Sequence, residues 1–493
     1  MSAPPMSRRG FLGTLAGAGL AAAGCGAFPE SAGRLLTSRL PLPAPFTVPL
    51  PIPPLARPVA PGRYEVTQRT AKVEIIPGTT TEIWGYDATF PGPTFELRRG
   101  DPTTIRVRNE LPEPTSTHLH GGVNPPGSDG YPTDLVVPRG HSAHPHGGHP
   151  SHPGMRLNPV AKDYHYPLDQ RAATLWYHDH RMDFTAPQVW RGLAGLALVR
   201  DEEEDALPLP RGERELPLLI CDRAFEEDGS FRYPRAHDPH YMAGVEGDVI
   251  LVNGAPWPVA EVSATRHRLR LLNASNARRY RLRLAPGGRF TQIGSDAGLL
   301  AAPVAHEVIP ISPGERYDVV VDFSAYPVGS AVTLTDELAG DVMRFVVTRR
   351  AADDSAVPAV LSRPPERTRA VAMRAFDFRR TGDAGNAAWT INGRPYRPGA
   401  PLARPRLGTA EMWRLTSDFH HPVHLHLAHF QVLARGGRPP SATDAGWKDT
   451  VDVRPYEVVD VLARFDGHRG RYMIHCHNLE HEDMAMMADF DVV

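Results

Sequence analysis

From about Tyr64 onward the chain alternates hydrophobic and polar positions, and this two-residue period predicts β-strands. Three stretches repeat one plan, in which a turn with glycine or Asn-Gly precedes a strand that alternates apolar residues with arginine. Copies spaced roughly 150 residues apart, a usual domain length, indicate three related β-sandwich domains. The three stretches are residues 84–109, 253–273 and 392–415.

Composition supports an all-β chain and sets the domain boundaries. Fifty-one prolines and 44 glycines suit many turns. The acidic run 201–205 reads as a hinge after the first domain, and residues 350–368, rich in Ala, Pro and Arg, separate the second from the third. The proline-rich residues 41–61 are either an extended tether or a strap lying on the first domain. We place the three domains at 62–205, 206–355 and 356–493.

The first 40 residues are predicted to be an export signal and a flexible segment. Arg8 and Arg9, followed by an apolar run to Ala23, resemble a twin-arginine signal. The run is too short and too rich in small residues for a stable membrane span. We expect a periplasmic, cell-envelope or extracellular protein. The residues before Cys25 also resemble a lipoprotein cleavage site, so a lipid anchor at Cys25 stays open.

Charge and cysteine content exclude several classes of protein. Lys and Arg number 54 and Asp and Glu 56, a balance that implies neither a nucleic-acid partner nor an acidic membrane surface. Of the three cysteines, Cys221 stands in an apolar run, as a small buried residue does. With Cys25 in the signal and Cys476 between histidines, no intramolecular disulfide is expected. A monomer is our expectation, although the sequence leaves dimerisation open.

The C-terminal segment carries the strongest chemical signal. Cys476 has His475 and His477 on either side, His481 five residues on and Met486 ten residues on. Thiolate, imidazole and a weak thioether are the ligands of a blue copper site. Because neighbouring strand residues point to opposite faces, His475 and His477 must serve a different metal centre from Cys476. The sequence thus predicts two metal centres joined by one residue of backbone.

Three further clusters supply the remaining imidazoles. Of 23 histidines, ten lie between residues 118 and 180, nine between 420 and 481, and four in the middle domain, none of these four at ligand spacing. We therefore expect the copper cluster to lie between the first and third domains, with the middle domain as a spacer that orients its neighbours. The clusters are His118 and His120; His178 and His180; and His421, His424 and His426.

These clusters resemble the four copper signatures of the multicopper oxidases. Longer segments resemble the bacterial laccase branch, which includes spore-coat laccases and bilirubin oxidases, and the similarity runs from about residue 60 to the end. The resemblance implies three cupredoxin-like Greek-key β-sandwiches and four coppers per chain. The segments that carry it are residues 117–122, 128–132, 175–180 and 446–450.

The resemblance also implies a role for each ligand. The weak axial thioether would give the type 1 copper a moderate redox potential. The implied ligands are His421, Cys476, His481 and axial Met486 for type 1; His118 and His424 for type 2; and, for the two type 3 coppers, His120, His178 and His477 on one and His180, His426 and His475 on the other.

Four acidic residues lie within or beside these motifs. Glu482 and Asp129 stand where close family members place proton donors near the cluster. We expect Asp179, between two ligands, to face away from the metals, although a role as acceptor from a ligand imidazole stays open. Asp449, in the matching segment Trp447–Thr450, is expected to give structural support.

The implied activity is one-electron oxidation of phenols, aromatic amines or bilirubin-like pigments, coupled to four-electron reduction of dioxygen to water. One alternative is a cuprous or ferrous ion oxidase, although such enzymes often carry methionine-rich insertions and the 12 methionines here form no group before the tail. A copper nitrite reductase would lack the trinuclear cluster. An envelope copper-binding protein rests only on the five histidines within residues 138–153, which could bind extra copper, gate a channel or belong to a solvated loop.

Overall fold

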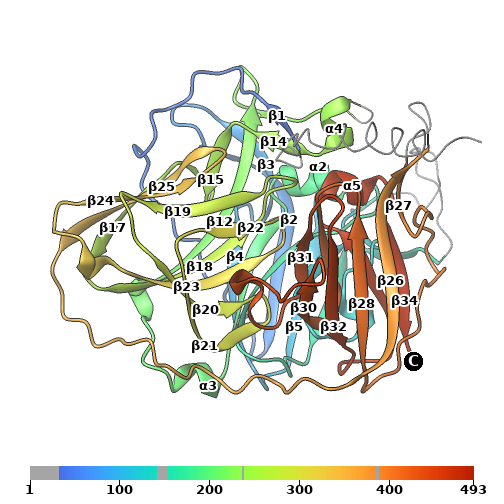
Figure 1. Ribbon diagram of the computed structural model, residues 1–493. Coiled ribbons are helices and arrows are strands. Elements are labelled where there is room, and N and C mark those ends of the chain that lie inside the picture. Colours follow the sequence, from blue (N-terminus) through green and yellow to red (C-terminus); the bar gives the residue numbers. More distant parts are fainter. Residues whose placement is uncertain (1–32, 141–153, 236–237, 383–387) are drawn as a thin grey trace, which may run out of the picture. The chain divides into compact units, whose positions relative to one another are not determined.

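The computed structural model describes residues 33–140, 154–235, 238–382 and 388–493. The predicted export signal with Cys25, and residues 141–153 of the histidine-rich loop, lie outside the described residues. Strands dominate the described chain, and its helices are short (Figure 1). None of these helices has the length and apolar character needed to cross a membrane. The all-β prediction is confirmed.

The first sandwich pairs two four-stranded sheets, in the orders β3-β2-β5-β9 and β4-β11-β10-β6. In β5 the buried positions alternate with half-buried ones, so that Ile105 and Val107 enter the core while Arg106 and Arg108 face outward. This explains the alternation of arginine with apolar residues in the sequence. The strands are β2 (Arg63–Val73), β3 (Thr81–Tyr86), β4 (Gly92–Arg98), β5 (Thr103–Asn109), β6 (Thr117–His120), β9 (Ala161–Tyr166), β10 (Ala173–Asp179) and β11 (Ala194–Arg200).

The second sandwich is the largest, with sheet orders β16-β15-β12-β18-β23-β20-β21 and β17-β25-β24-β19-β22. Its own apolar core lies between them. The strands are β12 (Glu215–Phe225), β15 (Val249–Val252), β16 (Ala255–Pro256), β17 (Val259–Ser263), β18 (Arg266–Asn273), β19 (Tyr280–Ala285), β20 (Phe290–Ser295), β21 (Gly298–His306), β22 (Ile309–Ile311), β23 (Arg316–Asp322), β24 (Ala331–Asp336) and β25 (Gly340–Arg349), and β13 (Phe231–Arg232) pairs with β12.

The third sandwich has the orders β27-β26-β28-β32-β30 and β31-β29-β33-β34, again around a core of its own. The three-sandwich prediction is confirmed, while the boundaries at 205/206 and 355/356 stay predictions. The strands are β26 (Ala370–Thr381), β27 (Ala388–Ile391), β28 (Ala410–Ser417), β29 (His421–Leu425), β30 (His429–Arg435), β31 (Thr450–Val453), β32 (Val458–Arg464), β33 (Gly470–Cys476) and β34 (Met487–Val492).

The segment before the first sandwich follows the surface of two sandwiches. Residues 41–61 form a strap that is hydrogen-bonded through the backbone to Val259 of β17 and to Thr94 of β4. The segment therefore lies on the second sandwich as well as the first. Residues 34–40, which were predicted to be flexible, are structured: β1 (Arg34–Leu36) pairs in parallel with β14 (Val245–Gly247), and Ser38 donates to Asp248.

The acidic run after the first sandwich is not a solvated hinge. Residues Glu202–Asp205 form the short helix α3, capped by the Asp201 side chain. Glu204 is buried and accepts hydrogen bonds at 2.9 Å from both Arg268 and Arg270 of β18. Arg270 also pairs with Glu215 at 2.5 Å. The run thus ends in an ion cluster that joins the first and second sandwiches.

This cluster predicts a large stability effect at one position. Arg270→Met removes one guanidinium from the buried carboxylates Glu204 and Glu215, which keep Arg200 and Arg268 as partners. The loss of these charged hydrogen bonds should destabilise the fold by about 1.5–3 kcal/mol. Denaturant unfolding measures it. The matched control is Arg289→Met, which breaks an ion pair with Glu307 that is about 70% exposed, and should cost under about 1 kcal/mol. Equal effects of the two substitutions would contradict the prediction.

The same cluster gives a pH dependence. Burial would raise the pKa of Glu204, but the neighbouring arginines outweigh it and lower the pKa to about 2. The pKa of Glu204 in the folded protein therefore lies below its ordinary value of 4.5. The stability that ionised Glu204 contributes is complete above pH 4.5 and is lost as the pH falls towards 2.

Candidate metal centres

One candidate centre gathers a thiol and two imidazoles inside the third sandwich. His421 Nδ1 lies 3.2 Å from Cys476 Sγ, His481 Nδ1 lies 3.7 Å from the same sulfur, and the two Nδ1 atoms are 3.2 Å apart. All three side chains are fully buried. The sequence prediction named these three residues together, and the structure brings them together.

The backbone after Cys476 explains why these residues meet. β33 ends at Cys476, the Asn478 side chain caps α5 (Leu479–Asp483), and the helix carries His481 back over the sulfur. The Cys476 N–H then donates to the Met486 carbonyl at 3.1 Å, and Met486 is buried in the same core as Cys476. The predicted axial residue is thus tied to the cysteine through the backbone.

The second candidate centre is built by strand pairing within two sandwiches. In the first, β6 and β10 are antiparallel neighbours, with His118 opposite His178. In the third, β29 and β33 place His424 opposite His475. Ladder pairs lie about 4.5–5.5 Å apart at Cα, so each sandwich presents a tight group of imidazoles.

The two groups face each other across the boundary between these sandwiches. His118 Nε2 lies 3.4 Å from His424 Nε2, and His426 Nε2 lies 3.2 Å from His180 Nε2 and 3.0 Å from His475 Nε2. All eight histidines predicted for the second centre lie in it. Ligand atoms lie within 4.8 Å of one another in three groups of histidines: His118, His120 and His424; His120, His178 and His477; and His180, His426 and His475. A fourth group joins His118 and His426 with Asp129.

Alternation of side chains at the end of β33 separates the two centres. His475 and His477 enter two different groups of the second centre, whereas Cys476 belongs to the first. One residue of backbone therefore joins the two centres.

Hydrogen bonds aim the imidazoles inward. The Nδ1–H groups of His118, His178 and His424 donate to main-chain carbonyls at 2.6–2.9 Å. The opposite nitrogen then carries the lone pair that a metal needs. His178 Nε2, His120 Nδ1 and both ring nitrogens of His477 are buried without any hydrogen-bond partner. Several buried ring nitrogens without hydrogen-bond partners, close together, are what a metal site requires.

Burial sets the protonation of these groups. Desolvation lowers the pKa of His180 to about 4 and that of His477 to about 3, so both imidazoles are neutral and available as ligands. Burial also raises the pKa of the Cys476 thiol well above its ordinary value. The thiolate therefore needs a cation beside it, which a copper ion supplies.

Three predicted carboxylates differ in what they contact. Asp129 Oδ2 lies 2.8 Å from His426 Nδ1, and Glu482 Oε2 lies 3.2 Å from His475 Nδ1. Burial would raise the pKa of each, but the neighbouring imidazoles outweigh it and hold both below their ordinary values. The Asp179 carboxylate faces away, accepting from backbone N–H groups of Ser116 and Arg181, while its main-chain carbonyl accepts from His178.

A fourth carboxylate was expected only to support the structure. Asp449 Oδ1 lies 3.0 Å from His120 Nε2, and its two oxygens pair with both terminal nitrogens of Arg316 in the second sandwich. The segment around Asp449 is one of those that resemble the family. No spacing pattern in the sequence connects it with Arg316, 133 residues away.

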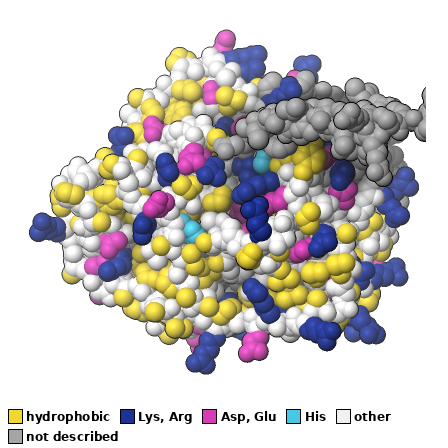
Figure 2. All heavy atoms as spheres, viewed as in Figure 1, with side chains coloured by type: hydrophobic (Ala, Val, Ile, Leu, Met, Phe, Trp, Pro, Cys, Tyr) yellow, Lys and Arg dark blue, Asp and Glu magenta, His cyan; other side chains and the backbone are white. Residues whose placement is uncertain are grey.

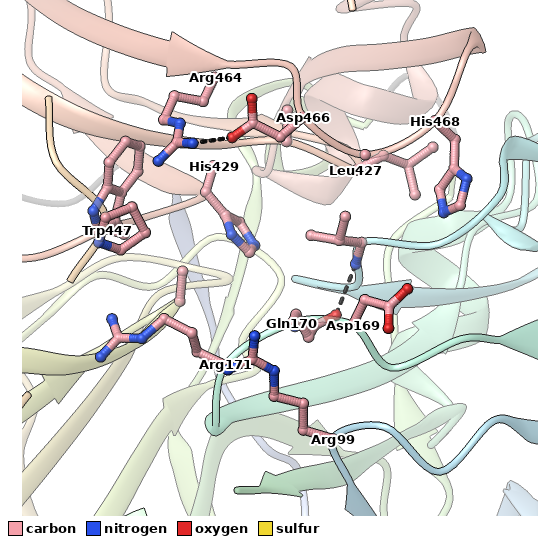
Figure 3. A pocket seen from close by; sticks show the side chains of 15 residues that line it. Arg99, Asp169, Gln170, Arg171, Leu427, His429, Trp447, Arg464, Asp466 and His468 are labelled. Carbon is pink, nitrogen blue, oxygen red and sulfur yellow. Dashed lines mark hydrogen bonds and ion pairs between the residues drawn. The ribbon is translucent and has the colours of Figure 1, made fainter. Parts of the chain in front are cut away.

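A cavity of about 440 Å³ lies beside the second centre (Figure 3). Its wall includes Val123 and Leu427, each of which follows a His-x-His segment, and Trp447. His429 points into it, and its Nε2 donates to the Gly121 carbonyl at 3.1 Å. One residue of the cavity wall thus contacts the backbone next to His120.

Comparison with known proteins agrees with these centres. Two family models, both described as multicopper oxidase, match residues 67–204, in two overlapping parts, and 363–493. A laccase from Bacillus subtilis (strain 168) is 35% identical over an alignment covering 91% of this chain and 98% of the relative. The chain belongs to the multicopper oxidase family.

Further relatives place this oxidase among laccase-like enzymes. A bilirubin oxidase from Albifimbria verrucaria is 36% identical, with 90% of this chain and 81% of that protein covered. The crystal structure of a multi-copper oxidase from Pediococcus acidilactici superimposes with a TM-score of 0.82 at 31% identity, covering 93% of each chain. Copper is therefore the metal that the two buried centres would hold.

Copper should also stabilise the folded oxidase. Metal that binds these preformed groups but not the unfolded chain adds about 3 kcal/mol per site when its concentration is 100 times the dissociation constant. Thermal unfolding of copper-loaded protein, compared with chelator-treated protein, should show a clear rise in midpoint on loading. Identical midpoints, at a confirmed difference in copper content, would contradict this.

Proposed function

We propose that the oxidase couples one-electron oxidation of phenols, aromatic amines or bilirubin-like pigments to four-electron reduction of dioxygen to water. The observation that carries this is the convergence of ten histidines and one cysteine into two buried centres joined at residues 475–477. A storage protein would not need that connection. The ligand roles that the sequence resemblance implies, four coppers in one type 1, one type 2 and two type 3 positions, are part of the proposal.

When bound, copper at these positions supplies one-electron redox chemistry at the first centre and dioxygen reduction at the second. The chain supplies the connection, since Cys476 and its flanking histidines are consecutive residues. It also excludes water, because every proposed ligand is buried. Met486, buried in the same core as Cys476, would be a further ligand of copper at the type 1 position.

Reduction of dioxygen to water consumes four protons, and two carboxylates are placed to handle them. Glu482 accepts from Thr185 Oγ1 at 2.7 Å and lies 3.2 Å and 3.5 Å from His475 and His180. Asp129 contacts His426 and lies 3.2 Å from His118. We assign both to proton transfer at the second centre. The cavity beside Val123 and Leu427 would give dioxygen and water access.

Aromatic rings beside the type 1 position support an aromatic reductant. The Trp389 ring stacks on His481 with centroids 3.9 Å apart, and Phe419 lies 6.0 Å from the same imidazole. Trp389 is buried, whereas Phe419 is only half-buried, so a phenol or aromatic amine can pack on Phe419 and pass an electron through the imidazole. Oxidation of cuprous or ferrous ions is the alternative that the test below must separate.

The destination of the chain is also a proposal. The twin-arginine-like N-terminus supports export to the periplasm, the cell envelope or the exterior, with a lipid anchor at Cys25 left open. Basic and acidic side chains are interspersed on the face in Figure 2 and form no single-sign surface there. Dioxygen and a small reductant are the proposed partners of the oxidase, which we expect to act as a monomer.

Phe419→Ala tests the reductant. Loss of the half-buried ring should lower kcat/KM for a simple phenol by up to about tenfold, because an aromatic pair contributes about 0.5–1.5 kcal/mol. Phe419→Tyr, which keeps a ring, should retain most of the activity. Steady-state oxygen uptake with the phenol and with cuprous ion measures both. A preference for cuprous ion that both variants leave unchanged would favour the metal oxidase.

Glu482→Gln tests the proton route. The substitution keeps the volume and removes the proton-accepting oxygen, so turnover at saturating reductant should fall about 100-fold or more, with the type 1 absorption unchanged.

The matched control for Glu482 is Glu480→Gln on the same helix. Glu480 is equally buried but bonds to Tyr233, Asn276 and the Val245 N–H rather than to a histidine. Turnover of Glu482→Gln equal to that of the wild type would refute the assignment.

A further inference from the structure

We infer that Asp449, held by Arg316 of the middle sandwich, is a positioning residue for the proposed trinuclear copper cluster. The middle domain would then set the geometry of that cluster, although it supplies none of the proposed ligands. This inference rests on the proposed copper assignment. It extends that assignment to residues that hydrogen-bond to the ligand imidazoles and do not themselves bind copper.

The first step concerns His120. Its Nε2 lies 3.0 Å from Asp449 Oδ1 and 3.1 Å from Thr450 Oγ1, whereas its Nδ1 is buried without a partner. A neutral imidazole carries one N–H, and a carboxylate can only accept. The proton is therefore held at Nε2, and the lone pair of Nδ1 is directed to the group that contains His178 and His477.

The same two residues also hold the neighbouring ligand. His424 Nδ1 donates to the Asp449 main-chain carbonyl at 2.9 Å and lies 3.2 Å from Thr450 Oγ1. The rings of His120 and His424 stack with centroids 3.6 Å apart and an angle of 12° between planes. Because these rings come from different sandwiches, Asp449 and Thr450 fix how the first and third sandwiches meet at the metals.

Arg316 fixes Asp449 in turn. The guanidinium is fully buried and donates to both Asp449 oxygens, at 2.7 Å and 2.5 Å. Its other bonds reach the Thr174 carbonyl of the first sandwich at 2.8 Å and the Asp296 and Gly314 carbonyls of the second at 2.9 Å. One side chain therefore connects all three sandwiches, and the bidentate geometry leaves the carboxylate little rotational freedom.

A second observation places the middle domain against the ligands directly. Gly314 adopts a φ of +85°, and a Cβ built there would lie 2.9 Å from His120 Cε1 and 3.0 Å from His477 Cδ2. The backbone just before Arg316 thus packs onto two imidazoles, with no room for a side chain. The middle domain contacts the cluster through this turn as well as through Arg316.

A buried ion pair with only a structural role would behave differently from a positioning pair. The matched control is Arg270, which is as buried as Arg316, bonds Glu204 and Glu215, and joins the first and second sandwiches. No hydrogen bond or ion pair described for Arg270 reaches a proposed copper ligand. Its loss should weaken the fold and leave the cluster's signature unchanged.

The experiment compares copper-loaded wild-type oxidase with Asp449→Ala, Asp449→Asn and Arg270→Met. Asp449→Ala should keep the type 1 absorption while the remaining copper is lost to a chelator about 10–100-fold faster, the usual effect of removing a ligand's hydrogen-bond partner. Asp449→Asn keeps the volume, so it should fold even where the alanine variant does not. It should shift the electron paramagnetic resonance parameters of the type 2 copper, because Asp449 Oδ1 accepts from Thr450 Oγ1, which also contacts His424 Nδ1. Arg270→Met should lower the unfolding midpoint and retain the wild-type resonance and copper release rate.

The remaining outcomes count against the inference alone or against the proposed function as well. Wild-type copper release and resonance parameters in both Asp449 variants would overturn the inference while the proposed function stands. A wild-type protein that holds one copper and shows no type 2 signal would refute the proposed function, and the inference with it. Changes in Arg270→Met equal to those in Asp449→Asn would show that any interface damage disturbs the cluster, and would also overturn the inference.

Discussion

Consecutive residues of a β-strand point to opposite sides, and both metal centres depend on this constraint. At the end of β33 the rule sends Cys476 into the core of the third sandwich, and His475 and His477 towards the first. The two centres cannot drift apart, because His475 and Cys476 pair with His424 and Val423 of β29, and the His477 N–H donates to the Pro422 carbonyl. The backbone therefore fixes the distance between the two centres.

The second constraint is the burial of so many polar groups at one place. Neutral imidazoles without partners are costly in a protein interior, and most of these rings have one nitrogen bonded to a carbonyl or a carboxylate. The inward nitrogens stay unsatisfied until a metal binds them. A cluster shared between two sandwiches has a further need, because each sandwich could shift relative to the other. The buried pairs Arg316–Asp449 and Arg270–Glu204 resist such shifts at different places.

The sequence was sufficient for the parts of this architecture that are local. His-x-His spacing on strands and the five- and ten-residue intervals after Cys476 depend on a few residues of backbone, so the histidine groups and the all-β class could be predicted. Contacts between distant segments could not. Nothing in the spacing connects Asp449 with Arg316 or Glu204 with β18. The acidic run alone therefore predicts a hinge, although Glu204 is buried. Asp179 shows a finer limit, since its carbonyl, not its carboxylate, serves the neighbouring imidazole.

The central claim is that both centres hold copper and act together on dioxygen. The most direct test is to count copper per chain in purified, copper-loaded protein and to measure how many equivalents of a one-electron phenolic reductant are oxidised per dioxygen consumed. The account predicts four coppers, an intense blue absorption and four equivalents per dioxygen, with water as the product. One copper with the blue absorption but no oxygen uptake, or two equivalents with peroxide as the product, would contradict it.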